Sequence, residues 1–257
     1  MTITTPPHAA RGPERAYWHD GSVATRVLVL EDDDGLRTSL RLMLEQDGYE
    51  VLEAERTEVG LAHLREGPID VMLVDLVLGG IDGFTFIRRA RLETIAPIIV
   101  ISARDKTTDV VHALEAGADD YVKKPFDVDE VQARLRAALR RPSIADGRHV
   151  RAEEAVVLDS ANGPLVFDPG AAQLRRAGEI IHLTHTEFQL LVALSENAGR
   201  VLSRSQLLEQ AWTSGHFGDE RIVDVHIRRL RTKVEIDPST PKLVQTIRGL
   251  GYRLDLR

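Results

Sequence analysis

Cysteine is absent from this chain of 257 residues. Its absence excludes disulfide bridges, thiolate catalysis and cysteine-ligated metals, so any bound ion must use oxygen or imidazole ligands. The chain also lacks an apolar run of about 20 residues, the length that a membrane-spanning helix needs. Hydrophobic residues nevertheless make up 43% of the sequence. We therefore expect a globular, cytoplasmic protein.

The first 23 residues lack both the apolar core and the small-residue cleavage site of a secretory signal, and we expect them to form a disordered tail. The rest is long enough for two domains of ordinary size. We place the first domain at residues 24–141 and the second at residues 154–257. A linker is expected over residues 142–153, where Gly147 interrupts a stretch without apolar periodicity.

Acidic residues predominate in the first half only. Residues 24–142 hold 16 Lys and Arg against 23 Asp and Glu, whereas residues 164–257 hold 13 against 11. Five cations of the second half fall between Arg221 and Lys233. This asymmetry predicts that only the second half meets a polyanion.

Short apolar runs alternate with amphipathic segments from residue 26 to residue 140. This rhythm is typical of a parallel sheet covered by helices on both faces. We therefore predict an α/β, doubly wound, five-stranded parallel sheet. Its strands are expected at Arg26–Leu30, Tyr49–Glu53, Asp70–Val74, Pro97–Ile101 and Asp119–Val122, and its last helix at Val128–Arg141.

The second half has the pattern of an α+β domain with three helices. Short strands are expected in LVFDPG and AQLRRAGEIIHL. Thr184-x-x-Glu187 and Ser203-x-x-Gln206 are capping-box sequences, which mark helix starts. A third helix follows Gly218, and the last residues predict two strands around a turn at Gly249.

Several polar residues lie where the parallel strands of the first half end: Glu31, Asp32, Asp75, Ser102 and Lys124. The carboxyl ends of parallel strands meet at one edge of the sheet, where such folds bind ligands. Carboxylates brought close together repel one another, and a hard cation such as Mg²⁺ relieves that repulsion. A cation, a carboxylate nucleophile, a hydroxyl and an ammonium group together favour phosphoryl transfer.

The blocks VLVLEDDDGLR, DVMLVDLVLGGIDG, PIIVISARD and GADDYVKKPF resemble the four signature blocks of receiver domains, a flavodoxin-like fold. The resemblance implies that a sensor histidine kinase phosphorylates Asp75. It implies that Glu31, Asp32, Asp75 and the main-chain oxygen of Val77 hold Mg²⁺. It also gives Ser102 and Tyr121 the role of switch residues, and Lys124 a contact with the phosphoryl group.

The same resemblance implies a homodimer that forms through the receivers on phosphorylation. The implied dimer face includes Glu115, Asp119, Asp120, Glu130 and Arg134. Two positions depart from the pattern of the family. Gly79 stands where proline is usual, which puts the lifetime of the acyl phosphate in doubt. Val110 stands where Lys or Arg is common, which leaves the strength of the dimer open.

The segment ERIVDVHIRRLRTKV separates into two faces on a helical wheel. Val223, Ile227, Leu230 and Val234 form the expected buried stripe. A cationic outer face on a helix suits the major groove of DNA, where arginine can read guanine.

This half resembles the winged helix-turn-helix effector of the OmpR/PhoB family, through LTHTEFQLL, VLSRSQLLEQAW, ERIVDVHIRRLR and VQTIRGLGYRL. The resemblance implies base contacts by Val225 and Arg229. It implies contacts elsewhere on double-stranded promoter DNA by Arg221, His226, Arg228, Arg231, Thr246 and Arg248. RNA polymerase is a candidate partner of a regulator of this kind.

Two alternatives remain open at this point. Asp32-x-Asp34-Gly35 resembles the acyl-phosphate motif of haloacid-dehalogenase-type phosphatases, and such an enzyme would carry phosphate on Asp32 and turn over small phosphoesters. The other alternative is a constitutive DNA-binding or interaction protein with an inert receiver. The main hypothesis is a transcriptional regulator rather than an enzyme, apart from its own phosphotransfer and dephosphorylation.

Overall fold

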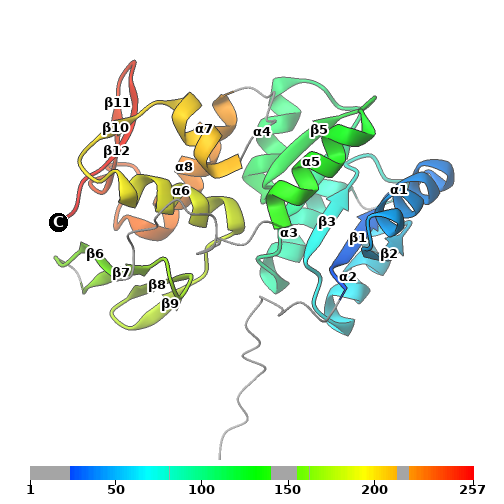
Figure 1. Cartoon of the computed structure of the whole chain (residues 1–257), viewed down its shortest axis with the longest axis horizontal. Coiled ribbons are helices and arrows are strands. Elements are labelled where there is room, and N and C mark those ends of the chain that lie inside the picture. Colours follow the sequence, from blue (N-terminus) through cyan, green and yellow to red (C-terminus); the bar gives the residue numbers. More distant parts are fainter. Residues whose placement is uncertain (1–23, 81, 140–154, 162, 213–219) are drawn as a thin grey trace, which may run out of the picture.

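The computed structural model describes residues 24–80, 82–139, 155–161, 163–212 and 220–257. The tail and the linker expected at 1–23 and 142–153 lie outside the described residues. Two bodies lie side by side, an α/β body containing α1 to α5 and an α+β body containing α6 to α8 (Figure 1).

A five-stranded, all-parallel sheet forms the first body, with the strand order β2-β1-β3-β4-β5. Every strand end lies within one residue of the predicted position, which confirms the predicted sheet. The strands are β1 (Arg26–Leu30), β2 (Glu50–Ala54), β3 (Val71–Val74), β4 (Ile98–Ser102) and β5 (Asp120–Lys123).

Helices cover both faces of this sheet, so its central strands are apolar throughout rather than alternating. Leu40 and Leu44 of one helix pack with Val131 and Leu135 of another on one face, and Phe86 lies in the cluster on the other face. The helices are α1 (Asp34–Gln46), α2 (Thr57–Glu66), α3 (Gly83–Glu93), α4 (Thr107–Ala116) and α5 (Val128–Leu139). Full burial of each large apolar side chain contributes about 1.5 to 3 kcal/mol.

The second body starts with a four-stranded antiparallel sheet, ordered β6-β7-β8-β9. Its strands are β6 (Val156–Asp159), β7 (Leu165–Asp168), β8 (Gln173–Arg176) and β9 (Glu179–Ile181). Three helices and a three-stranded sheet follow. They are α6 (His185–Glu196), β10 (Val201–Leu202), α7 (Arg204–Trp212), α8 (Arg221–Val234), β11 (Val244–Ile247) and β12 (Gly251–Leu254).

The helix starts and the final turn predicted for the second body are confirmed. The Thr184 side chain accepts a hydrogen bond from the Glu187 amide, and the Glu187 carboxylate accepts one from the Thr184 amide, which together form a capping box. The Ser203 hydroxyl likewise accepts a hydrogen bond from the Gln206 amide at 3.1 Å. Gly249 adopts a positive φ of 75° between β11 and β12, where a side chain would strain the turn.

Helix α8 packs against α4, and α7 packs against α5, so the two bodies share an interface (Figure 1). Among the helices that the structure describes, none is both long enough and apolar enough to cross a membrane.

Candidate functional site

The ends of β1 and β3 bring three carboxylates together at the sheet edge. Glu31 and Asp75 are buried, whereas Asp32 is exposed. One oxygen atom from each of the three lies within 4.8 Å of the others. The predicted convergence of these side chains is therefore present in the structure.

The Lys124 ammonium joins two of these carboxylates. Its Nζ atom donates hydrogen bonds to Oε2 of Glu31 at 2.7 Å and to Oδ2 of Asp75 at 2.6 Å. Burial favours the neutral amine, but the hydrogen bonds to Asp75 and Glu31 outweigh it and hold the pKa of Lys124 above its usual value. Lys124 is thus a fixed positive charge beside the Asp75 carboxylate.

Main-chain amides of the loop after β3 orient the carboxylates. The amide of Val77 donates to Oδ1 of Asp75 at 2.9 Å, and the amide of Gly79 donates to Oδ2 of Asp32 at 3.0 Å. Proline at position 79 would have no N–H to donate, so the departure from the family pattern adds a hydrogen bond here. Asp33 caps α1 instead of joining the cluster, because its Oδ1 accepts a hydrogen bond from the Leu36 amide at 2.7 Å.

Ser102 and Tyr121 lie on neighbouring strands next to this cluster. Ser102 ends β4 and is fully buried. The Tyr121 ring is also buried, and its hydroxyl donates to the main-chain oxygen of Arg104. Burial raises the pKa of Tyr121 to about 12, so the phenol remains protonated at neutral pH.

The chemistry of the cluster suits a hard divalent cation. Glu31, Asp32 and Asp75 offer oxygen ligands only, which Mg²⁺ prefers in proteins. Asp34, part of the alternative phosphatase motif, instead lies on α1, where it is exposed and forms an ion pair with Arg37.

The buried stripe predicted for α8 is confirmed, since Val223, Ile227, Leu230 and Val234 are at most 1% exposed. The residues predicted to face DNA differ in their exposure to solvent. Arg221 and Arg228 are exposed and Arg229 is half-buried, whereas Val225 and His226 are buried.

The hairpin β11–β12 forms the predicted wing. Arg231 ties α8 to it by donating from Nη2 to the main-chain oxygen of Val244 at 2.6 Å and to the hydroxyl of Thr246 at 2.7 Å. Arg248 lies exposed at the turn. Arg231 and Thr246, both predicted to contact DNA, are therefore hydrogen-bonded to each other within the chain. Arg248, in contrast, extends into solvent.

The predicted dimer face already carries ion pairs within the chain. Arg134 pairs with Asp120 at 2.7 Å and with Glu130 at 2.7 Å. Asp119 is buried, and Glu115 forms an ion pair with Arg228. Asp119 and Glu115 thus contact residues of the second body, whereas the Asp120–Arg134–Glu130 set lies within the first.

Sequence reasoning missed two charged residues near this face. Arg91 of α3 bonds to Asp119 and donates to the main-chain oxygen of Gly117 at 2.7 Å. Glu187 was expected only as a helix-capping residue, but its buried carboxylate also forms ion pairs with Lys233 and Arg229. Neither role leaves a local pattern, because both partners are remote in sequence.

Comparison with known proteins identifies both halves of the chain. Residues 27–136 match the family described as "Response regulator receiver domain", and residues 178–254 match "Transcriptional regulatory protein, C terminal". The transcriptional regulatory protein AfsQ1 of Streptomyces coelicolor is 46% identical over 230 residues, which cover 89% of this chain and 97% of that protein.

Other proteins are also similar to this chain. The DNA-binding response regulator MtrA of Mycolicibacterium smegmatis is 41% identical over 228 residues, covering 89% of this chain and 96% of that protein. A solved structure of a RitR mutant is 27% identical, has a TM-score of 0.68, and is matched over 90% of this chain and 99% of that one. The chain therefore belongs to the OmpR/PhoB-type response regulators of two-component systems, in which a receiver domain is followed by a winged-helix DNA-binding domain.

Proposed function

We propose that the chain is a transcriptional regulator whose DNA binding depends on phosphorylation of Asp75 by a sensor histidine kinase. The observation that carries this proposal is the convergence of Glu31, Asp32, Asp75 and Lys124 at one sheet edge. Three carboxylates and one ammonium at one edge suit the transfer of a phosphoryl group onto an oxygen nucleophile.

In the transfer step, an Asp75 carboxylate oxygen forms a bond to phosphorus while the bond between phosphorus and the kinase histidine nitrogen breaks. The histidine nitrogen keeps the electron pair of the broken bond. The Val77 amide, 2.9 Å from Oδ1 of Asp75, fixes the orientation of the nucleophile. Lys124 offers its positive charge to the oxygens of the arriving phosphoryl group. In dephosphorylation, a water oxygen forms a bond to phosphorus while the bond between phosphorus and the Asp75 oxygen breaks, which releases inorganic phosphate and restores the carboxylate. The same residues support this step, so the receiver catalyses its own phosphotransfer and dephosphorylation.

A Mg²⁺ ion would be held by Glu31, Asp32, Asp75 and the main-chain oxygen of Val77. When bound, it neutralises charge on the phosphoryl oxygens. The exposed position of Asp32 leaves that side of the cluster open to an ion arriving from solvent.

Ser102 and Tyr121 would then respond to the phosphoryl group. The Ser102 hydroxyl lies on the strand next to β5, opposite Lys123 in register. A hydrogen bond from Ser102 to the phosphoryl group would draw the end of β4 toward Asp75. Because Tyr121 is hydrogen-bonded to the Arg104 carbonyl, movement of that loop changes the position of the aromatic ring.

The effector would read promoter DNA with α8 and the wing. Val225 and Arg229 are assigned to DNA bases. The residues assigned to the DNA backbone or the minor groove are Arg221, His226, Arg228, Arg231, Thr246 and Arg248. If three or four of these cations reach phosphates, the salt slope of one domain is about −3 to −4, and that of a pair is doubled. A pair of domains on adjacent half-sites therefore binds far more tightly than one.

Phosphorylated receivers would pair through the dimer face named above, in a protein that acts in the cytoplasm. Glu115, Asp119, Asp120, Glu130 and Arg134 supply charges for exchange between two copies. Val110, half-buried on α4, supplies none. RNA polymerase is the further partner that we propose for the DNA-bound pair.

Phosphodonor treatment tests the assignment of Asp75. The full chain is incubated with Mg²⁺ and a small phosphodonor, and the intact mass is measured. We expect a gain of one phosphoryl group that is lost in Asp75→Asn and retained in the matched control Asp34→Asn, whose carboxylate is exposed and lies outside the cluster. No gain would favour an inert receiver, and a phosphoryl group on Asp32 with turnover of phosphoesters would favour the phosphatase.

A further inference from the structure

The tip of the wing exposes an apolar side chain. Leu250 is 62% exposed, although leucine is among the residue types that are most often buried in proteins. It lies in the turn between β11 and β12, two residues after the exposed Arg248. The hairpin projects from the end of the second body that is remote from the first (Figure 1). The wing therefore presents an apolar group and a cation to solvent at one tip.

Two glycines fix the shape of this turn. The Leu250 amide donates a hydrogen bond to the main-chain oxygen of Ile247 at 2.9 Å, which closes a four-residue turn. Gly249 occupies the third position of the turn with a φ of 75°, a conformation that other residues rarely adopt. A Cβ atom on Gly251 would lie 2.0 Å from the main-chain oxygen of Leu202, so this glycine lets the hairpin pack closely against β10. The backbone that carries the exposed leucine is thus held on both sides.

The wing is also tied to helix α8. The Tyr252 hydroxyl donates a hydrogen bond to Oδ1 of Asp224 on α8 at 2.6 Å. Arg231 of α8 donates to the main-chain oxygen of Val244 in β11, also at 2.6 Å. Helix and hairpin therefore move as one unit, and a helix that lies in a major groove carries the tip of the wing toward the adjacent minor groove.

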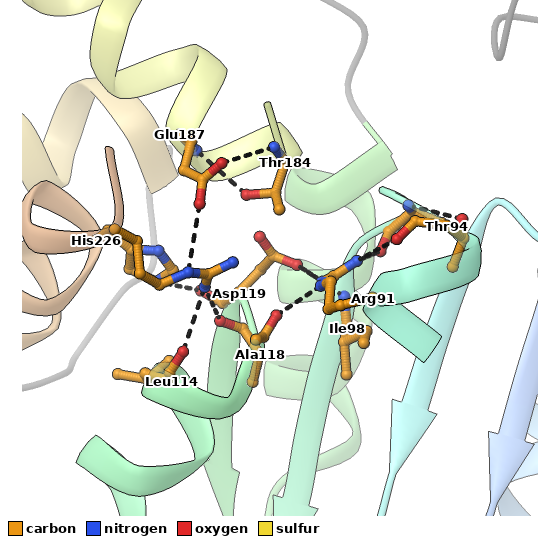
Figure 2. A network of polar contacts seen from close by, with 12 residues as sticks. Arg91, Thr94, Ile98, Leu114, Ala118, Asp119, Thr184, Glu187 and His226 are labelled. Carbon is orange, nitrogen blue, oxygen red and sulfur yellow. Dashed lines mark hydrogen bonds and ion pairs between the residues drawn. The ribbon is translucent and has the colours of Figure 1, made fainter. Parts of the chain in front are cut away.

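The reading face of α8, unlike the tip of the wing, contacts the first body. The main-chain oxygen of Asp119 lies 3.1 Å from Nε2 of His226 (Figure 2). Arg229 donates hydrogen bonds to main-chain oxygens of α4 and of the turn after it, and Arg228 forms an ion pair with Glu115. We call these bonds the closed contact, and a chain in which they are broken open. The closed contact leaves the tip of the wing exposed.

An arginine and a leucine at one tip match the chemistry of a minor-groove wedge. A narrow minor groove concentrates negative potential, which attracts an inserted arginine. Apolar side chains, leucine among them, enter between two base pairs from that groove, partly unstack them and kink the duplex. The kink forms most easily at flexible pyrimidine–purine steps. A wedge therefore selects DNA by its deformability rather than by hydrogen bonds to bases.

We propose that Leu250 is a DNA wedge: Arg248 guides the tip of the wing into the minor groove, and Leu250 inserts there at a pyrimidine–purine step and bends the duplex. This inference rests on the proposed function, because it takes α8 and the wing as the DNA-binding surface. Insertion removes from water the apolar surface that the free chain exposes, which offsets part of the cost of unstacking. It also adds a sequence preference that no base-reading side chain supplies.

Four full-length proteins test the wedge. All carry Glu115→Arg, which places a cation opposite Arg228 and so weakens the closed contact without changing the second body. One has no further change. Leu250→Ala removes the wedge, whereas Leu250→Met replaces it by an unbranched apolar side chain of similar volume. Leu256→Ala is the matched control, because Leu256 is also exposed, at 48%, but follows β12 at the end opposite the turn.

Bending of bound DNA is the first measurement. The probe is a duplex selected from a random pool by the Glu115→Arg chain, with one fluorophore at each end, and a small phosphodonor and Mg²⁺ are present throughout. Energy transfer between the fluorophores reports the bend. We expect a bend of about 20 to 90° with Glu115→Arg alone, with Leu250→Met and with Leu256→Ala, and at most about half of it with Leu250→Ala. An equal bend with Leu250→Ala would overturn the inference.

The preference for one base step is the second measurement. Each protein selects duplexes from a random pool, and all should select the same bases under α8. A pyrimidine–purine step should be enriched at one further position by the chains that keep Leu250, and not by Leu250→Ala. We expect a TA step at that position to bind about tenfold more tightly than a stiff A-tract step when Leu250 is present, and about equally when it is absent. The same preference in both would contradict the wedge.

The outcomes separate the wedge from the proposed function. Sequence-specific binding to a duplex that stays straight would overturn the wedge and leave the DNA-binding function intact. Absence of sequence-specific binding by all four proteins would overturn both.

Discussion

The main-chain oxygen of Asp119, 3.1 Å from Nε2 of His226, fixes the protonation of that imidazole. A carbonyl oxygen can only accept a hydrogen bond, so Nε2 carries the hydrogen. Nδ1 of His226 is buried and has no hydrogen-bond partner. A second proton on Nδ1 would therefore create a buried charge without a hydrogen-bond acceptor. The closed contact requires a neutral His226.

We predict that acid opens the closed contact. Burial, helped by the nearby guanidinium groups of Arg229 and Arg91 and opposed by Asp119, lowers the pKa of His226 to about 3. In the open chain, His226 regains its ordinary pKa of about 6.5. A depressed pKa means that the stabilisation is fully present above pH 6.5 and is lost as pH falls below it, by up to about 1.36 kcal/mol per unit.

Trp212 reports this opening directly, because its Nε1 contacts the same Asp119 carbonyl. In a Trp18→Phe background Trp212 is the only tryptophan. Its fluorescence emission should shift to the red between pH 7.5 and pH 5.5. His226→Gln should remove the shift, since an amide can donate to Asp119 but does not titrate. His185→Gln should keep it, although burial lowers the pKa of His185 too. A shift that survives in His226→Gln would contradict the assignment.

Arg229→Ala should have opposite effects on closure and on sequence reading. The change removes the donor to the Ala118 and Leu114 carbonyls, which weakens the closed contact. It also removes a base contact, which should cost about 1 to 3 kcal/mol on the cognate site and relax one base position. Selection from random duplexes in the Glu115→Arg background isolates the second effect. An unchanged base preference would remove Arg229 from the reading set.

DNA and the phosphoryl group should assist each other's binding, because both favour the open chain. Coupling between two ligands is reciprocal in free energy. Beryllium trifluoride, a stable mimic of the phosphoryl group, should tighten duplex binding by some factor, and the duplex should tighten binding of the mimic by the same factor. Titration calorimetry measures both arms. In Glu115→Arg the factor should approach one, and a factor equal to that of the wild type would argue against a shared open state.

Sequence periodicity predicted the receiver well because its strands are short, buried on both faces and separated by amphipathic helices. The Val71–Val74 strand shows no alternation, and that lack of polarity itself identifies a covered parallel sheet. The capping box at Thr184 located α6 to the residue. The sheet that opens the second body was predicted only in part. Its first strand, Val156–Asp159, was missed because it is short and follows a stretch without apolar periodicity.

The interface between the two bodies could not be predicted, because no local pattern records it. Val225 and His226 lie on the face of α8 that the helical wheel assigns to solvent or DNA, and yet they are buried. His226 and Arg229 bond to main-chain oxygens, which every residue carries and which no sequence motif marks. Asp119 was predicted only as a member of a pairing face. The sequence was enough to predict the chemistry of single residues. The structure was needed to show that residues predicted to contact DNA instead contact the first body.

Gly83 begins α3 against the main chain of the loop that follows Asp75. A Cβ atom at Gly83 would lie 2.2 Å from the main-chain oxygen of Asp75 and 2.7 Å from Cα of Leu76. Gly83→Ala must therefore push the backbone beside the carboxylate cluster, at a cost of about 1 to 3 kcal/mol. Gly80→Ala is the matched control, because no atom lies within 4 Å of its Cβ position. Urea unfolding should show a lower midpoint for Gly83→Ala alone, together with slower phosphorylation of Asp75. Equal midpoints for the two variants would mean that the loop yields freely, and that the α3 start does not position Asp75.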